Sequence, residues 1–291
     1  MLQQNNYKIK ILTASLFLVV ALPTFKVYAT QNNNEYYQSK QYIHALTNQV
    51  EEAKRLDRQA ELFDPFIFSI LKSVEIDKSK PILELGCGTC AHTKTIRNLF
   101  KSARIIGVDL DKTQLSLCKD KIENHLLYES SVLDLPFKNN YASLAVFVHV
   151  LEHLTTTEAI KALTEAKRVI SEGGYVLAFE VMMSKINLEQ LKKTKKFVNA
   201  MVKEQKKYGN ANFGEYKNFL HVATSSGFTK DNILYQEVVI NVDNQYLIDL
   251  LKTAKNLIMS VNFDEVEKEL VMNKTQIKIP FGIVLLKKAK T

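Results

Sequence analysis

The chain has 291 residues, of which 46% are hydrophobic and 24% are charged, with a formal net charge of +8. These values are those of an ordinary globular protein, so they exclude a disordered chain and a membrane protein with many spans. The length predicts one main domain with additions, and the modest positive charge identifies no partner.

Residues 1–29 differ in character from the rest. Two basic residues, Lys8 and Lys10, precede an apolar run from Ile11 to Leu22, and the segment ends in the small residue Ala29. The run is shorter than the roughly 20 residues that span a bilayer. The segment is therefore predicted to be a signal peptide, so that the protein is exported or secreted, or alternatively an uncleaved N-terminal anchor that associates it with a membrane.

Residues 30–78 are predicted to form an N-terminal helical cap. Apolar side chains recur every three or four residues from Tyr42 to Val74, which indicates helix. Because proline is well suited to the first turn of a helix, Asp64 and Pro65 are expected to start a second, short helix.

The main domain is expected to occupy residues 79–291. Short apolar strands are predicted at 81–86, 104–109, 125–130, 142–150 and 174–180, with helices at about 90–101, 112–122 and 156–170 between most of them. Strands that alternate with helices predict an α/β fold with a parallel, doubly wound sheet.

The order of elements changes after Met183. Helices are predicted at about 185–207, 213–226, 244–259 and 263–271, and strands at 233–241 and 276–286. The first two of these helices make up a helical insertion at about 185–230. The last two strands are expected to pair antiparallel at one edge, which gives seven strands, and Pro280 favours an edge or a bulge for the final strand.

The three cysteines are an odd number and do not indicate a disulfide framework. Cys87 and Cys90 form a C-x-x-C pair, but no second pair or set of ligands lies nearby, so no metal is expected. We interpret them as small side chains fitted into a tight turn.

The segment PILELGCGTCAHT, residues 81–93, runs from a strand through a glycine turn into a helix. Glycines let the backbone approach a ligand, and the free N–H groups of the helix start point at it, so the turn is a nucleotide site. Gly86, Gly88 and Ala91 fit the dinucleotide fingerprint, and Asp109 follows at the expected distance of about 20 residues. The turn alone leaves a dinucleotide and other nucleotide ligands open.

Glu84, at the end of the strand, distinguishes these ligands. Its charge would be costly beside a pyrophosphate and favourable beside an ammonium group. The predicted ligand is therefore cationic at this point, with an adenosine further along. Glu84, Asp109 and Asp134 all end successive strands, where open α/β sheets bind ligands.

Over about residues 80–182 the sequence resembles the class I S-adenosylmethionine-dependent methyltransferases. ILELGCGTC is similar to their first motif, IIGVDLDKTQL to their second strand and its acidic end, SVLDLPFKNNYASLAVFVHVLEHL to their third and fourth motifs, and RVISEGGYVLAFE to the helix, turn and fifth strand that follow. The departures are Cys90 for the usual third glycine and Ser171-Glu172 for the usual Lys-Pro, and both lie in predicted turns. The resemblance implies a Rossmann-like sheet with helical caps, and S-adenosylmethionine as the cofactor.

The resemblance also implies which residues bind the methionine part of the cofactor. The turn of Gly86, Cys87 and Gly88 would allow its close approach, and Glu84 would bind its ammonium group directly or through water. His149 would lie beside the methionine end, near the transferred methyl group.

The adenosine part is implied to lie along the next two strands. Asp109 would accept hydrogen bonds from both ribose hydroxyls, and Leu110 would pack against the adenine. Asp134 would hold the adenine amino group, and Leu135 would cover the other side of its ring.

The segment HVLEH, from His149 to His153, also matches the inverted zinc-protease signature H-x-x-E-H. That signature needs both histidines on a helix, whereas His149 ends an apolar strand, so the two are expected to diverge. His149, Glu152 and His153 are instead the candidate catalytic residues if the acceptor must lose a proton.

The sequence thus predicts an enzyme, a methyltransferase that transfers a methyl group directly to a small-molecule or lipid-like acceptor. Basic and aromatic residues do not interleave, so nucleic acid is not expected as a partner. Two alternatives stay open, an NAD-dependent oxidoreductase and a non-catalytic effector module that binds the cofactor.

Overall fold

The computed structural model describes residues 49–118, 126–207, 209–210, 212–256 and 258–290, all within one compact unit, Asn34–Thr291. The predicted signal peptide or anchor, residues 1–29, lies outside the described residues. Among the residues that are described, no helix combines the length and the apolar character needed to cross a bilayer.

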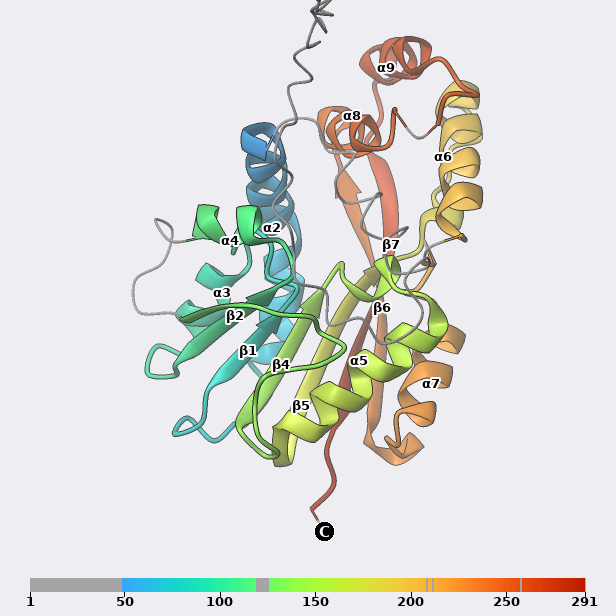
Figure 1. Cartoon of the computed structure of the whole chain (residues 1–291). Coiled ribbons are helices and arrows are strands. Elements are labelled where there is room, and N and C mark those ends of the chain that lie inside the picture. The colour runs from blue at the N-terminus through green and yellow to red at the C-terminus, as the bar shows by residue number, and fades with distance from the viewer. Residues whose placement is uncertain (1–48, 119–125, 208, 211, 257, 291) are drawn as a thin grey trace, which may run out of the picture. The chain divides into compact units, whose positions relative to one another are not determined.

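The strands and helices follow the predicted order (Figure 1). The strands are β1 (Ile82–Leu85), β2 (Ile105–Asp109), β3 (Leu126–Glu129), β4 (Ala142–Val148), β5 (Ile170–Val181), β6 (Ile233–Val242) and β7 (Ile277–Lys287). The helices are α2 (Gln49–Leu71), α3 (Thr93–Leu99), α4 (Lys112–Cys118), α5 (Thr156–Val169), α6 (Lys192–Gln205), α7 (Tyr216–Ser225), α8 (Asn244–Thr253) and α9 (Phe263–Met272), with short 3-10 helices η1 (Leu151–His153), η2 (Met183–Lys185) and η3 (Lys230–Asn232).

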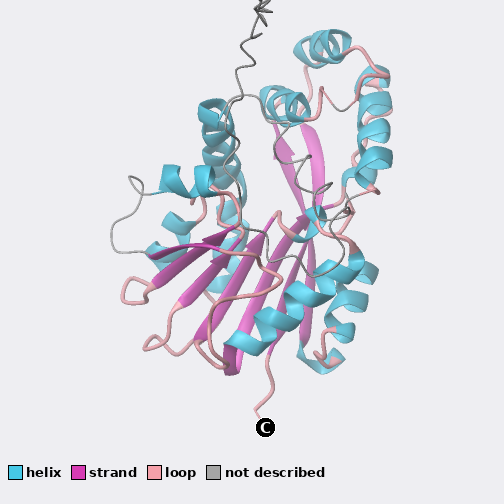
Figure 2. Ribbon diagram, viewed as in Figure 1, coloured by secondary structure: helices cyan, strands magenta, loops and turns pink. Residues whose placement is uncertain are grey.

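The seven strands form one sheet in the order β3-β2-β1-β4-β5-β7-β6 (Figure 2). Strands β1 to β5 pair in parallel, and β7 pairs antiparallel with both β5 and β6. The predicted α/β fold with seven strands and antiparallel strands at one edge is confirmed.

The central strands bury side chains on both faces of the sheet. Along β4, Leu144 and Val146 belong to the core that includes α2 and α3, whereas Ala145 and Phe147 belong to the core that includes α5 and α7. This alternation is the two-residue period of a strand covered on both sides. Helices α6, α8 and α9 lie beyond these layers, near one end of β6 and β7 (Figure 1).

Helix α5 begins with a capping box that also fixes the chain next to the candidate site. The Thr155 hydroxyl accepts the Glu158 N–H at 3.3 Å, and the Glu158 carboxylate accepts the Thr155 N–H at 2.9 Å. Two donors that a helix start leaves unpaired are thereby satisfied. Because η1 lies immediately before this cap, the cap also helps to fix the position of η1.

The predicted second helix at Asp64 and Pro65 is wrong. Helix α2 runs through Pro65 without a break. Its apolar face stays buried on both sides of the proline, with Phe63 and Ile67 almost fully covered. Asp64 also contacts His92 Nδ1 at 2.6 Å. These tertiary contacts outweigh the loss of one helical hydrogen bond.

Pro280 does not mark an edge strand, because β7 lies between β5 and β6. Its carbonyl accepts the Met182 N–H at 3.0 Å, just beyond the last β5 to β7 pair, Val181 and Phe281. In an antiparallel strand the N–H and C=O of one residue point to the same side. The donor that proline lacks therefore faces the end of β5, where the ladder stops.

The expectation that the cysteines form no disulfide is also wrong. Cys90 and Cys118 are disulfide-bonded, with their Cα atoms 5.3 Å apart, whereas Cys87 is a buried free thiol. The partners are 28 residues apart and meet because α4 ends beside the glycine turn. No spacing pattern in the sequence carries that information.

Candidate functional site

A cavity of about 290 Å³ opens at the carboxyl ends of β1, β2 and β4. The strand order runs away from β1 in both directions, with β2 on one side and β4 on the other. Open α/β sheets bind ligands outside the carboxyl ends of their strands at such a switch point. Most of the predicted site residues line this cavity: Gly86, Cys87, Gly88, Asp109, Leu110, His149, Glu152 and His153.

The glycine turn makes one wall of the cavity and is held by the neighbouring strand. Gly86 has φ +73° and Gly88 has φ +51°, in the left-handed region that favours glycine. A Cβ on Gly86 would lie 2.5 Å from a methyl group of Val150, so a side chain there would also clash. The Gly86 N–H donates to the Val108 carbonyl at 2.7 Å. The two glycine positions therefore present only backbone to the cavity, and a hydrogen bond holds the turn against the end of β2.

Asp109 links the end of β2 to the turn. Its Oδ2 accepts the Gly88 N–H at 2.7 Å and its Oδ1 accepts the Asp111 N–H at 2.8 Å. Burial raises the pKa of Asp109, while these two N–H donors act in the opposite direction. Each carboxylate oxygen has a second lone pair, so Asp109 can still accept hydrogen bonds from two hydroxyl groups of a ligand.

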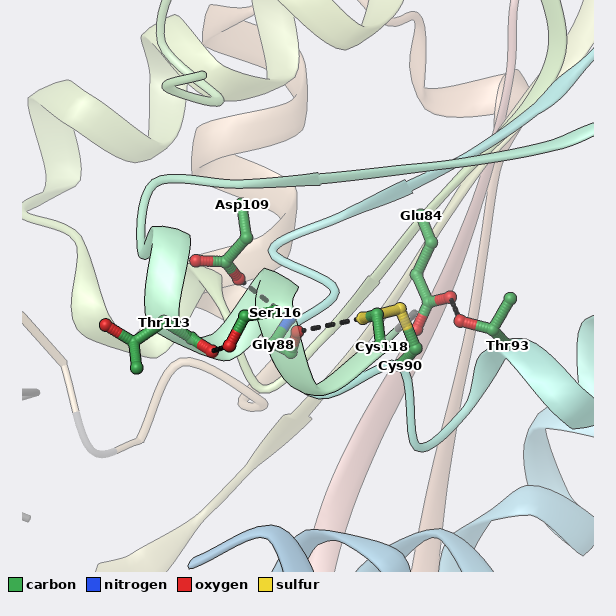
Figure 3. The surroundings of a disulfide bond; sticks show 8 residues. All are labelled: Glu84, Gly88, Cys90, Thr93, Asp109, Thr113, Ser116 and Cys118. Atoms are coloured by element: carbon green, nitrogen blue, oxygen red, sulfur yellow. Dashed lines mark hydrogen bonds between the residues drawn. A yellow bond between two sulfur atoms is a disulfide. The ribbon is translucent and has the colours of Figure 1, made fainter. Parts of the chain in front are cut away.

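Glu84 lies behind the turn and is 3% exposed (Figure 3). The Thr93 hydroxyl, at the start of α3, donates to its Oε2. Burial raises the pKa of Glu84 from 4.5 to about 7, although the Thr93 hydrogen bond and the nearby His92 lower it. A buried carboxyl group without a cationic partner has this property, and an ammonium group beside it would favour the charged form.

Asp134 and Leu135 do not line the cavity. Asp134 is exposed, and Leu135 is buried in the core with α5. The cavity wall after β3 comes instead from the preceding residues Ser130, Ser131, Val132 and Leu133. The predicted adenine contacts at Asp134 and Leu135 stay a prediction, and the structure adds Val132 and Leu133 as apolar side chains facing the same space.

The chain after β4 makes the opposite wall. His149 has φ +56°, and η1 follows directly. His149 Nδ1 lies 3.5 Å and His153 Nε2 3.7 Å from the same oxygen of Glu152. The expectation that the two histidines of HVLEH diverge stays a prediction, because the group of ligand atoms within 4.8 Å of one another contains His149 and not His153. Both histidines contact Glu152 because η1 is a tight turn rather than the start of a long helix.

Glu180, on β5, fixes the η1 turn through hydrogen bonds to its backbone. Its carboxylate accepts the backbone N–H groups of Val150, Leu151 and Glu152 at 3.2, 2.9 and 3.2 Å. Burial and the neighbouring Glu152 raise the pKa of Glu180 well above its ordinary value. The His149 ring packs against three phenylalanine rings, with centroid distances of 5.3 to 5.6 Å. The backbone and the ring are therefore both fixed.

The charges of this wall follow from burial and proximity. Burial raises the pKa of Glu152, but His149 and His153 outweigh it, so the pKa lies below its ordinary value. Burial lowers the pKa of His153. Two buried atoms here, His149 Nε2 and Glu152 Oε2, have no hydrogen-bond partner among the described residues. An ionised carboxylate and a ring nitrogen are thus available to a ligand.

A buried polar group on α2 and α8 was not predicted from the sequence. Arg55 pairs with Glu52 through two hydrogen bonds of 2.7 and 2.6 Å and donates to Gln59 at 2.8 Å. The Tyr246 hydroxyl lies 3.2 Å from the same Gln59 oxygen. All four residues line the cavity. One feature of the sequence could have indicated this buried polar group: Glu52 and Gln59 share a helix face with the apolar Leu56.

Within the described part of the chain, two groups of side chains have ligand atoms within 4.8 Å of one another, as a metal site requires. They are His149, Glu152 and Glu180, and the three cysteines. In the first group Glu180 already accepts three backbone N–H groups, and in the second Cys90 and Cys118 are bonded to each other. Both arrangements are explained by contacts within the protein.

A family model described as "Methyltransferase domain" matches residues 83–178, from β1 to β5. Over these residues the chain is similar to methyltransferase domains. The resemblance to class I methyltransferases, drawn from the motifs, is thereby confirmed, and the matched segment contains both walls of the cavity just described.

Curated relatives and solved structures agree with this assignment. The tRNA (carboxymethyluridine(34)-5-O)-methyltransferase of Arabidopsis thaliana is 28% identical over 139 residues, which are 47% of this chain and 32% of that protein. An uncharacterised methyltransferase of Schizosaccharomyces pombe is 33% identical over 116 residues, 36% of this chain and 41% of that protein. The chain thus spans less than half the length of these two relatives. A solved structure assigned as a methyltransferase of Bacillus halodurans covers 77% of this chain and 97% of its own, with a TM-score of 0.53 and 11% identity, and shows a common fold.

Proposed function

We propose that this chain is an S-adenosylmethionine-dependent methyltransferase that transfers a methyl group directly to a small-molecule acceptor. The observation that carries the proposal is the carboxylate of Asp109, bonded to the Gly88 N–H at 2.7 Å and lining the cavity at the switch point of the sheet. An acidic side chain at that place suits the two hydroxyls of a ribose.

The residues around the cavity fit the parts of this cofactor. The bare turn from Gly86 to Gly88 gives room for close approach, and the buried carboxyl of Glu84 behind it favours a cation over a phosphate. Leu110 and Val132 offer apolar surface for an adenine. When bound, the cofactor supplies an activated methyl group on a sulfonium, so the protein mainly aligns the acceptor and excludes water.

The acceptor would lie at the end of the cavity next to α2 and α8. That end combines apolar walls such as Met183 and Met201 with the buried polar groups of Arg55, Gln59 and Tyr246. An acyl chain seated there would cover polar groups without offering hydrogen bonds, which is unfavourable. A small molecule with polar groups is therefore a better acceptor than a lipid.

His149 would accept the proton if the acceptor must lose one. The carboxylate of Glu152 lies beside Nδ1 at 3.5 Å, which favours the tautomer with its proton on that nitrogen. Nε2, which has no partner among the described residues, then acts as the base. Glu152 would position the ring and stabilise its charged form.

We further propose that the protein is exported, on the basis of the basic and apolar segment at residues 1–29. The disulfide between Cys90 and Cys118 is consistent with an oxidising compartment. Protease protection on intact cells tests this, and a chain that is uncleaved and protected on the cytosolic side would contradict it.

The cofactor proposal is tested by calorimetry on the full chain with S-adenosylhomocysteine and, separately, with NADH. Binding of S-adenosylhomocysteine alone is the expected result, and binding of NADH alone would favour the oxidoreductase alternative. A screen of cell extracts with labelled methyl donor then tests the activity. Cofactor binding without any labelled product would favour the non-catalytic effector module, and a labelled lipid would overturn the choice of a small polar acceptor.

A further inference from the structure

The disulfide lies inside the nucleotide-binding part of the domain (Figure 3). Cys90 closes the glycine turn and has φ +59°, and Cys118 is the last residue of α4. The chain between the two cysteines contains α3, β2 and Asp109, the residue proposed to bind the ribose. The Cys118 sulfur also lies 3.3 Å from the Gly88 carbonyl oxygen. The bond therefore joins the turn to the helix that follows the ribose-binding residue.

Few of the described residues of helix α4 are buried against the domain. The helix has seven residues, and only Leu115 and Cys118 among them are buried. Both belong to a small apolar cluster whose other buried members are Cys87 and Cys90. The disulfide is thus a main part of what holds α4 against the turn, and α4 contributes Gln114 to the cavity wall.

Cys118 is fully buried, whereas Cys90 is 2% exposed and does not line the cofactor cavity. Cys90 lines a groove of about 620 Å³ between α2 and α3, together with Asp57, Glu61, Asp64, Lys94 and others. Three carboxylates against one lysine make this part of the groove acidic, so it favours a cationic or neutral reagent.

Cys87 is 6% exposed, but it does not line this groove and is unsuited to thiol exchange. A Cβ added to Gly107 would lie 2.9 Å from its sulfur, which shows how closely the sulfur packs on β2. Burial, together with Asp109 and Glu84, raises the pKa of Cys87 well above its ordinary value. The thiolate is the reactive form of cysteine, so Cys87 stays an inert thiol.

We propose that Cys90 and Cys118 form a thiol–disulfide exchange site, reached through the groove between α2 and α3. We call the glycine turn, Asp109 and α4 together the nucleotide cradle. The oxidised state of the two cysteines holds this cradle in its binding form. In the oxidising direction the two thiols react with one small organic disulfide, RSSR. The bond between Cys90 and Cys118 forms, the bond of RSSR breaks, and two RSH molecules carry away both protons and both electrons. Reduction by two small thiols reverses these steps and lets α4 separate from the turn.

The inference rests on the proposed function only in that the cradle binds the cofactor. Because a cradle fixed in advance binds more tightly than one that must be ordered, we expect reduction to weaken S-adenosylhomocysteine binding by about tenfold. Calorimetry on the full chain compares protein oxidised with cystamine and protein reduced with a phosphine, and alkylation followed by mass spectrometry confirms one or three reactive thiols after denaturation. Equal affinity in the two states would overturn the inference and leave the proposed function intact, whereas binding in neither state would contradict both.

Two variants separate the disulfide from general effects of the reagents. Cys118→Ser is expected to bind as weakly as the reduced protein and to be insensitive to either reagent. Cys87→Ser, whatever its own affinity, is expected to keep the tenfold ratio between the oxidised and reduced states. The comparison of the unsubstituted chain in its two states keeps the test valid if a variant fails to fold. Faster oxidation by the dication cystamine than by anionic oxidised glutathione supports entry through the acidic groove, and the reverse order would overturn that route.

Discussion

Glu84 is expected to destabilise the protein without its cofactor while strengthening the binding of the cofactor, and Glu84→Gln separates the two effects. The folded protein raises the pKa of this carboxyl from 4.5 to about 7 because the group is buried. Each pKa unit corresponds to about 1.4 kcal/mol, so the ionised carboxylate costs about 3 kcal/mol of folding stability above pH 7.

The direction of the pH effect on folding stability follows from which state, folded or unfolded, binds the Glu84 proton more tightly. The folded state holds the Glu84 proton up to about pH 7, whereas the unfolded chain releases it near its ordinary pKa of 4.5. This group therefore adds stability as the pH falls from 7 towards 4.5, and its cost is fully present above 7. At pH 8 the variant should unfold at a temperature higher by roughly 5 to 10 °C. At pH 4.5 the two proteins should differ little, since both side chains are neutral there.

Binding should change in the opposite direction. A hydrogen bond to a charged group contributes about 1.5 to 3 kcal/mol, so loss of the carboxylate should weaken S-adenosylhomocysteine binding by roughly 10- to 100-fold at pH 8. In the unsubstituted protein the affinity should rise with pH through about 7, where the group ionises. In Glu84→Gln the affinity should not rise with pH through about 7, because the amide at this position does not ionise.

Thermal unfolding at pH 8 and pH 4.5, and calorimetry between pH 5.5 and 8.5, measure both effects. Glu129→Gln is the matched control, because it removes an exposed carboxylate at the end of β3, which is separated from β1 by β2. It should leave stability and affinity unchanged. A Glu84→Gln variant that is less stable at pH 8, together with unsubstituted protein whose affinity does not vary with pH, would refute the reasoning.

Three further substitutions test other parts of the site and the fold. Asp109→Asn keeps the shape of the side chain but removes the charge next to the Gly88 N–H, and it should lower S-adenosylhomocysteine affinity by about tenfold or more in calorimetry; an unchanged affinity would exclude a ribose contact. Glu152→Gln should lower the rate of methyl transfer by about 100-fold with an acceptor from the labelled screen and should change cofactor affinity by less than about threefold; equal losses of both would contradict a positioning role. Gly282→Ala would place a Cβ 1.9 Å from the Gly214 carbonyl oxygen, so it should cost about 2 to 4 kcal/mol in denaturant unfolding, and a neutral effect would mean that the turn containing Gly214 can move away from β7.

The sheet could be predicted from the sequence because each strand carries its own local signal. Strand β4 is a continuous apolar run, and its predicted span differs from the observed one, Ala142–Val148, only at the end next to the site. Helix α6 was predicted to start at about 185 but begins at Lys192, because η2 and a turn at 189–190 come first. The lysines and apolar residues there have helical spacing, but tertiary packing decides where the helix starts.

The candidate site was predictable where a strand end fixes a residue and not where two distant elements meet. Asp109 follows its strand directly, so its place at the cavity followed from the fold alone. Asp134 follows a loop after β3, and the loop turns it towards solvent. Arg55 lies on α2, and only the packing of α2 and α8 brings it to the cavity together with Tyr246.

The pairing of Cys90 with Cys118 connects the chemistry of the site with the compartment in which the protein works. The turn residue Cys90 is half of a disulfide, so in our proposal the order of the cradle depends on the redox state of its surroundings. An exported chain would keep the bond and hold the cradle ready, but it would depend on cofactor supplied by another cell, because S-adenosylmethionine is made in the cytosol. A chain retained in the cytosol would have cofactor at hand but would keep both thiols reduced and α4 loosened from the turn. A formed disulfide, which we propose tightens cofactor binding, and an available cofactor would therefore coincide only where the protein is delivered to an oxidising place that also holds the cofactor.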